Sequence, residues 1–279
     1  MQHRSRPNAH RNMLPPHPGS NLSKLLLWLD STNLHALYHS RSSNFSNTSL
    51  VSNATHAVQL REISKLYGSF AALRKVTAEF ATGKCYVILG QNGAGKSTLL
   101  RLLAGLIRPS FGTCSVLGSA EISTVRRSIG YLSHDSMLYD ELTAMENLRY
   151  SAHLYQDDSE SAYSLLAPEQ VLAMVGLDAR LDRPMGKFSQ GMRQRAALAR
   201  VLMPKPELLL LDEPFSNVDL ASSGQMLQVL AELRAAGKTI LLTTHQPELA
   251  RPIADFVCTM HEGQIVSIEA AHVPEGRSA

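Results

Sequence analysis

The sequence "GQNGAGKST", at residues 90–98, limits the fold more than any other stretch of the chain. Its residues 90–97 match the pattern G-x-x-x-x-G-K-[ST]. They lie between the apolar run "CYVIL" and the run "TLLRLLAGLI", in which apolar residues recur at helical spacing. These runs predict a β-strand and a helix. Glycines in the connecting loop let several backbone N–H groups converge on a phosphate. The stretch therefore predicts a strand, a phosphate-binding loop and a helix in that order.

The residue types around this loop suit a nucleotide with magnesium. Lys96 is expected to reach the β- and γ-phosphates, and the Ser97 hydroxyl is expected to bind Mg²⁺. The later stretch "ELLLLDEP" supplies a buried strand that ends in two acids. Asp212 would hold the water shell of the magnesium ion, and Glu213 would accept a proton from an attacking water. The alternative interpretation is a strand that ends in two solvated acids, and the presence of the phosphate loop disfavours it.

The rest of the chain alternates between strand and helix patterns. "AVQLREISKLYG" and "LRKVTAEFATGKCYVILG" predict strands with a turn at Thr82-Gly83, and "TILLTTH" predicts another strand. Residues 141–185 are expected to be mostly helical, "KFSQGMRQR" to start a basic helix, and "SGQMLQVLAELRAAGK" to form a helix ending at Gly237. Nearly unbroken apolar strands that alternate with helices predict an α/β fold with a buried parallel sheet.

Composition excludes several other classes of protein. At 279 residues the chain can hold one large domain or two small ones. Its longest apolar runs fall far short of the roughly 20 residues that a membrane helix needs, so we expect no membrane span. Three widely spaced cysteines, Cys85, Cys114 and Cys258, form no metal-binding pattern. They are expected to be small buried residues of a protein in a reducing compartment.

The first 56 residues differ from the rest of the chain. They are rich in Asn, Ser and His, as in a disordered leader. They carry five basic side chains and one acid, which leaves residues 57–279 at a formal charge of −1. A nearly neutral body argues against a nucleic-acid partner. The leader is interpreted either as an organelle transit peptide or as the product of a start codon assigned too early, with translation beginning near Val51. Sequencing the N-terminus of the native protein would decide between them.

Taken together, these motifs resemble the ATP-binding subunit of ATP-binding cassette (ABC) transporters. The resemblance covers about residues 57–266 and includes "FSQGM", which stands in place of the family signature LSGGQ. It implies a P-loop ATPase of the ABC type with a mainly parallel core sheet, an N-terminal antiparallel β subdomain and a helical signature subdomain. The implied ATPase domain spans 57–268, with the helical subdomain at about 135–205 and a flexible tail at 269–279.

The resemblance also assigns roles to single positions. Ser189 and Gly191, at the start of the signature helix, would cap the γ-phosphate of ATP held by the opposite subunit. Asp219 ends the loop that crosses the dimer, Tyr67 would stack on adenine, and His245 would contact the γ-phosphate and position the water. The phosphate loop would bind ATP through Gly90, Asn92, Gly93, Ala94, Gly95, Lys96, Ser97 and Thr98.

Two positions depart from the family pattern. Gln190 and Met192 replace Gly and Gln of the signature, but a helix N-terminus with its serine still suits an anion. His134 stands where the family has a Gln that touches Mg²⁺, and neutral imidazole is a metal ligand or a hydrogen-bond partner. His134 followed by "ELTAMENLRY", together with "FSQGMRQR", looks like the ATP-binding subunits of haem exporters used in cytochrome c maturation. Exporters of drugs or polysaccharides share much of this pattern.

The implied function is ATP hydrolysis that drives export through separate integral membrane permeases. Two ATP–Mg²⁺ complexes would lie between two such subunits, identical or not, at the cytoplasmic face of the inner membrane. One alternative is a soluble ABC protein that acts on ribosomes or DNA, but such relatives usually carry two cassettes or long coiled-coil insertions. Another is an inactive scaffold that binds ATP as a switch, which the intact Lys96, Asp212, Glu213 and His245 disfavour.

Overall fold

The computed structural model describes residues 55–155 and 164–271. Of the leader expected at residues 1–56, residues 1–54 lie outside the described residues, and His56 is already the first residue of strand β1; the expected tail from residue 272 onward also lies outside. Strand β9 runs to Ala270, two residues into the stretch expected as tail.

A three-stranded antiparallel sheet comes first. Its strands run in the order β2-β1-β4. Their bounds are His56–Tyr67 (β1), Phe70–Ala81 (β2) and Phe111–Val116 (β4). In β1 and β2, buried apolar residues such as Val58, Leu60 and Phe80 face the core while polar neighbours remain exposed. This alternation is typical of a sheet with one solvated face.

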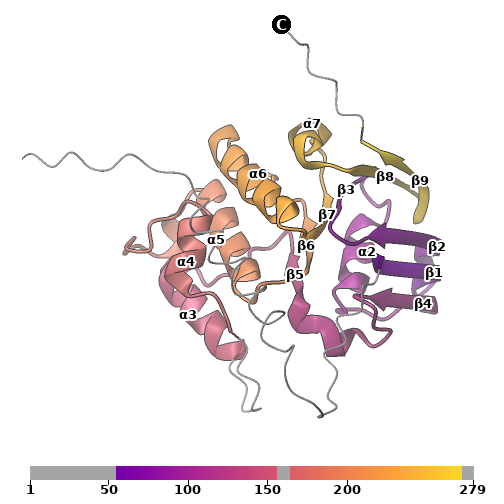
Figure 1. Ribbon diagram of the computed structural model, residues 1–279, viewed down its shortest axis with the longest axis horizontal. Coiled ribbons are helices and arrows are strands. Elements are labelled where there is room, and N and C mark those ends of the chain that lie inside the picture. Colours follow the sequence, from indigo (N-terminus) through magenta and orange to yellow (C-terminus); the bar gives the residue numbers. More distant parts are fainter. Residues whose placement is uncertain (1–54, 156–163, 272–279) are drawn as a thin grey trace, which may run out of the picture. The chain divides into compact units, whose positions relative to one another are not determined.

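The second sheet has six strands in the order β5-β6-β7-β3-β8-β9 (Figure 1). All neighbouring strands are parallel except β8 and β9. The bounds are Cys85–Leu89 (β3), Ile129–Leu132 (β5), Leu208–Asp212 (β6), Thr239–Thr243 (β7), Phe256–His261 (β8) and Gln264–Ala270 (β9). Every residue of β6 and β7 is buried, which explains their unbroken apolar runs. The carboxyl ends of β3, β6 and β7 meet at one edge, where loops bear ligand-binding groups in such sheets.

The helices fall into two groups. α2 (Lys96–Leu103) contacts β6, β7 and β2, and α6 (Leu220–Ala235) contacts α5 and α7. α3 (Ala144–Tyr155), α4 (Pro168–Met174) and α5 (Gln190–Leu202) contact one another and form a helical group apart from the antiparallel sheet (Figure 1). The short elements are α7 (Pro247–Ala250) and the 3₁₀ helices η1 (Ile122–Ser128), η2 (Met185–Lys187) and η3 (Arg251–Ile253). None of the helices in the described part of the chain has both the length and the hydropathy that a membrane crossing requires.

One apolar core joins the two sheets through α2. Leu99, Leu100, Leu102 and Leu103 of this helix are fully buried among residues of both sheets. Full burial of a leucine side chain contributes roughly 1.5–3 kcal/mol relative to exposure. The helix is shorter than the apolar periodicity of residues 98–107 suggested, because the chain turns at Gly105 with φ +69°. The packing of α2 fixes the loop before it against the parallel sheet.

The three cysteine thiols are free and packed into this framework. Cys85 and Cys258 are buried and Cys114 is half-buried. Burial raises the pKa of each thiol to about 12. Because the thiolate is the reactive form, these side chains act as small apolar residues at neutral pH.

Candidate active site

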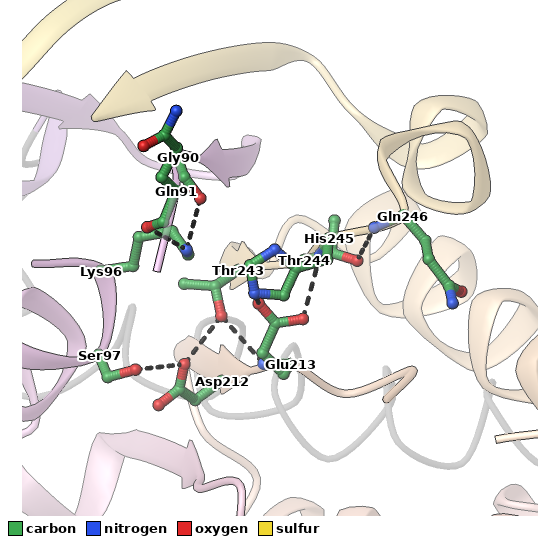
Figure 2. Close-up of polar contacts among 10 residues, drawn as sticks. All are labelled: Gly90, Gln91, Lys96, Ser97, Asp212, Glu213, Thr243, Thr244, His245 and Gln246. Atoms are coloured by element: carbon green, nitrogen blue, oxygen red, sulfur yellow. Dashed lines mark hydrogen bonds and ion pairs between the residues drawn. The ribbon is translucent and has the colours of Figure 1, made fainter. Parts of the chain in front are cut away.

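The phosphate loop has a backbone shape that needs glycine. Gly95 has φ +99°, and a Cβ there would lie 2.6 Å from the Ala72 carbonyl oxygen. The Lys96 side chain, only 7% exposed, folds back into the loop. Its Nζ donates to the carbonyl oxygens of Gly90, at 2.7 Å, and Gln91, at 3.2 Å (Figure 2). The loop thus holds a positive charge beside unpaired N–H groups at the start of α2, which favours an anion there.

The carboxyl end of β6 brings an acid to the same place. The Ser97 hydroxyl donates to Asp212 Oδ1 at 3.0 Å, and the Thr243 hydroxyl donates to the same oxygen at 2.8 Å (Figure 2). Asp212 is only 2% exposed. Two charge-assisted hydrogen bonds therefore fix the orientation of this carboxylate. They come from α2 and β7, two of the elements that contact β6.

Glu213 follows Asp212 in a strained backbone conformation. Its φ of +53° lies in the left-handed region, which costs a residue with a side chain of order 1–3 kcal/mol. Its N–H donates to Thr243 Oγ1 at 2.9 Å. The carboxylate faces His245, whose backbone N–H donates to Oε2 at 3.1 Å and whose Nε2 lies 3.1 Å from Oε1 (Figure 2). The turn after β6 thus aims a carboxylate at the histidine that follows β7.

These groups line one open pocket of about 400 Å³. Of the residues predicted from the sequence, it is lined by Asn92, Gly93, Ala94, Gly95, Lys96, Ser97, Thr98, His134, Asp212, Glu213 and His245. Gly90 contributes its carbonyl oxygen to Lys96 behind the loop. Tyr67 is absent from the lining, whereas Phe70, its cross-strand neighbour in β2, is part of it. The Tyr67 ring is half exposed and has Lys65 Nζ 5.2 Å from its centroid.

The signature residues lie outside this pocket. Ser189 caps α5, where its Oγ accepts from the Met192 N–H at 3.3 Å. Asp219 caps α6 by accepting from the Ser222 N–H at 2.9 Å, and these hydrogen bonds hold the pKa of Asp219 below its usual value. Both capping residues are exposed. Ser189 and Asp219 are therefore accessible to a second protein molecule.

The donor atoms in the pocket suit magnesium. Mg²⁺ prefers hard oxygen ligands and is usually held by one or two protein oxygens together with waters and phosphates. The Ser97 hydroxyl and the Asp212 carboxylate provide such a pair. Within the described residues, no three His, Cys, Asp or Glu side chains gather as a preformed metal centre. Imidazole suits zinc or copper better than magnesium, so His134 fits a hydrogen-bonding role more closely than a direct ligand role.

Comparison with known families decides the identity of this arrangement. Residues 73–216 match the family model described as ABC transporter. The chain belongs to the ABC transporter family. It is 34% identical over 218 residues to the Nod factor export ATP-binding protein I of Burkholderia orbicola, covering 77% of this chain and 71% of that protein. It is 35% identical over 199 residues to the ABC transporter ATP-binding protein NatA of Bacillus subtilis, covering 70% and 80%.

Solved structures confirm the predicted ABC ATPase fold. The dimeric post-hydrolysis state of the ATP-binding cassette MJ0796, bound to ADP and Pi, matches with a TM-score of 0.68 and 26% identity. The match covers 77% of this chain and 99% of that one. A structure described as the ATP binding subunit of an ABC transporter matches with a TM-score of 0.66 and 30% identity, covering 77% and 90%. The names of these relatives do not support the more specific resemblance to haem exporters.

Sequence reasoning missed Thr243, which holds Asp212, and the pocket-lining residues Phe70 and Ala72; it expected Ser216 only in the loop that crosses the dimer. Thr243 stands at the end of β7, and the strand register places it beside Asp212. A polar residue directly after the apolar run of residues 240–242 was the available signal. Phe70 is the first residue of β2 and Ser216 lies in a turn, and the sequence offered no periodic pattern at either position.

Thr243→Val tests the part that this hydroxyl plays. Valine has nearly the same shape, so the change leaves the Glu213 N–H unpaired and removes one partner of Asp212, at about 1–3 kcal/mol. We expect a lower melting temperature and a kcat for ATP hydrolysis reduced roughly tenfold, which corresponds to about 1.4 kcal/mol. Thr239→Val, at the other end of β7, removes a hydroxyl that accepts from the Gly83 N–H and is the matched control. It should lower stability but leave kcat unchanged; an equal loss of kcat in both variants would contradict the assignment.

Proposed function

We propose that this chain is the ATP-hydrolysing subunit of an ABC exporter that works with separate membrane permeases. The observation that carries the proposal is the pocket in which Lys96, Ser97, Asp212, Glu213 and His245 converge at one edge of the parallel sheet. Family membership supports ATP as the ligand. The names of the relatives, which include Nod factor export, support export as the direction.

The proposed binding step uses the phosphate loop. Its free N–H groups and the Lys96 ammonium bind the β- and γ-phosphates, with Lys96 exchanging its loop carbonyls for phosphate oxygens. Ser97 and Asp212 would hold Mg²⁺, which supplies positive charge next to the transferred phosphoryl group. Thr243 keeps the Asp212 carboxylate oriented. Phe70 and Tyr67, at the adjoining ends of β2 and β1, offer the aromatic surface for adenine.

The proposed chemical step uses the turn after β6. Glu213 accepts a proton from the attacking water, and its left-handed backbone directs the carboxylate toward the pocket. His245 orients that carboxylate through its backbone N–H and lies close enough for its ring to contact the water or the γ-phosphate. A general base of this kind typically contributes ~10²–10⁴-fold to the rate. His134, on the same pocket wall, would hydrogen-bond to the water shell of the metal.

The proposed assembly pairs two such subunits head to tail. Ser189 and Gly191 of one subunit would then cap the γ-phosphate held by the loop of the other, and Asp219 would reach across the same interface. Exposure of Ser189 and Asp219 outside their own pocket supports this arrangement, and so does similarity to a dimeric cassette bound to ADP and Pi. The pair would lie at the cytoplasmic face of the membrane against the permeases. The partner subunit is a second copy of this chain or a related one.

The transported compound is a finer question. Haem export for cytochrome c biogenesis rests on His134 followed by "ELTAMENLRY" and on "FSQGMRQR", whereas the names of the relatives support a wider class of exporters that includes Nod factor export. Cargo contacts are expected in the permease, so this chain's residues do not select among these compounds. Export by an ABC pair is therefore the proposal, with haem as one substrate hypothesis and drugs or polysaccharides as the alternatives.

The test is recovery of the full chain from native membranes in mild detergent, with co-purifying proteins identified by mass spectrometry and ATP hydrolysis measured on the same sample. A multi-span permease together with ATP hydrolysis is the expected result. A permease of the haem-exporter type would support haem, and a drug- or polysaccharide-type permease would discard it. Recovery with ribosomes and without a membrane partner would overturn the transport function.

A further inference from the structure

We infer that Gly191 and Ser222 form an internal contact that locks the start of α5 to the start of α6, so that Ser189 and Asp219 reach the partner's nucleotide as one unit. This inference rests on the proposed function and adds Ser222 as a positioning residue. It also gives Gly191 a role inside its own subunit, besides the nucleotide contact that the family resemblance implies.

Close approach at Gly191 is the first observation. Gly191 is buried, although Ser189 and Gln190 just before it are exposed. A Cβ added at Gly191 would lie 2.6 Å from Ser222 Cβ, closer still to Ser222 Oγ, and 2.8 Å from Asp219 Oδ2. Carbon atoms that are not bonded need about 3.5–4.0 Å. Position 191 therefore has no room for a side chain, because the other helix occupies the space.

Ser222 links this contact to the loop before α6. It is 6% exposed, and its N–H donates to Asp219 Oδ1 at 2.9 Å. The other carboxylate oxygen of Asp219 faces Gly191. One capping carboxylate thus touches both helix starts, with an oxygen bound to α6 and an oxygen against α5. A displacement of either helix start relative to the other would open a gap at Gly191.

The groups on either side of this contact are the ones expected to meet the partner subunit. Ser189 precedes Gly191, and Asn217 and Asp219 precede Ser222; all three are exposed. Packed helices resist small independent shifts because interiors are close-packed. Rigid pairing of the two helix starts therefore presets the spacing between Ser189 and Asp219 before a second subunit arrives.

A compensation experiment on the full chain tests this role. Gly191→Ala adds the Cβ that Ser222 obstructs, and Ser222→Gly removes the two Ser222 atoms closest to it, which leaves Asp219 Oδ2 at 2.8 Å. The two single variants and the double variant are compared by melting temperature without nucleotide, by titration with a fluorescent ATP analogue, and by kcat for ATP hydrolysis. Gly224→Ala is the matched control, because Gly224 lies exposed in α6 with nothing within 4 Å of an added Cβ.

We expect Gly191→Ala to lower the nucleotide-free melting temperature and to reduce kcat at least about tenfold. At protein concentrations where the chain is monomeric, its affinity for the ATP analogue should not change, since Gly191 lies outside its own subunit's pocket. Adding Ser222→Gly should recover most of the kcat and of the melting temperature that Gly191→Ala loses, measured against Ser222→Gly alone. Asp219 Oδ2, which still lies 2.8 Å from the added Cβ, accounts for the remaining loss. The Gly224→Ala control should melt at the same temperature or higher.

Two results would overturn the inference. One is a double variant as slow as Gly191→Ala, which would mean that the added Cβ acts on the partner's nucleotide and not on Ser222. The other is a nucleotide-free melting temperature that Gly191→Ala does not change. If Gly191→Ala does not fold, Ser222→Thr replaces it, because the added methyl group crowds the same contact from the α6 side. An unchanged kcat of Ser222→Thr would also overturn the inference. A wild-type chain without ATPase activity would refute the proposed function instead, while the melting temperatures would still decide the contact.

Discussion

Glu213→Gln is expected to reduce the kcat of ATP hydrolysis by about 10²–10⁴-fold, the usual contribution of a general base. Glutamine has the shape of glutamate and keeps an oxygen that accepts from the His245 N–H, so the turn after β6 should survive. It cannot accept a proton at neutral pH. The left-handed φ of +53° at this position does not change in cost, because both residues carry a similar side chain. Affinity for ATP should stay close to wild type, since Lys96 and the loop are untouched.

The matched control for this prediction is Glu248→Gln. Glu248 is an exposed acid of α7, shortly after His245, and does not line the pocket. The Glu248→Gln variant should hydrolyse ATP at the wild-type rate. Total phosphate formed in acid-quenched single-turnover reactions, compared with phosphate released, separates the chemical step from product release. A Glu213→Gln variant that releases phosphate at the wild-type rate would remove Glu213 from the proposed role.

Lys96→Ala is expected to weaken ATP binding at least about 100-fold, or roughly 2.7 kcal/mol. The Lys96 ammonium is already desolvated inside the loop, where two carbonyl oxygens hold it. Binding of phosphate therefore exchanges two hydrogen bonds to neutral carbonyls for hydrogen bonds to a charged phosphate, without a new desolvation cost for the lysine; hydrogen bonds to charged groups are worth about 1.5–3 kcal/mol. Without Lys96, the carbonyl oxygens of Gly90 and Gln91 would face the phosphates with no intervening cation.

Isothermal titration of the full chain with ATP and magnesium measures this effect. Lys84→Ala is the control, because this substitution also removes one positive charge and Lys84 is an exposed lysine in the turn before β3. It should bind ATP as the wild type does. A dissociation constant for Lys96→Ala within about threefold of the control would mean that the loop N–H groups alone account for the affinity.

Local patterns predicted the strand, loop and helix around Lys96 because their spacing is set within one short stretch of chain. The strand that ends at Asp212 was equally clear, since burial on both faces leaves an unbroken apolar run. Strands β4 and β5 gave no such signal. β4 is mostly exposed and forms by pairing with β1, and β5 has four residues that include Gly130.

Contacts between segments that are distant in the sequence limit how much of the site could be predicted. Thr243 reaches Asp212 through the register of β6 with β7, and the sequence does not show which strands become neighbours. The same limit applies to Gly191. Position 191 has no room for a side chain because Ser222 of another helix occupies the space. The signature pattern suggested an anion at the start of α5. It could not show that this helix start also packs against α6.

The central claim is that ATP is held between two subunits, with Ser189 of one facing the loop of the other. Light scattering on full-length Glu213→Gln measures it most directly, because a chain that binds ATP without hydrolysing it should accumulate as the closed pair. We predict the monomer mass without nucleotide and twice that mass with ATP and magnesium. Adding Ser189→Arg should leave ATP binding intact and keep the chain monomeric. A monomer mass for Glu213→Gln with ATP bound, or a dimer that Ser189→Arg does not disturb, would contradict the account.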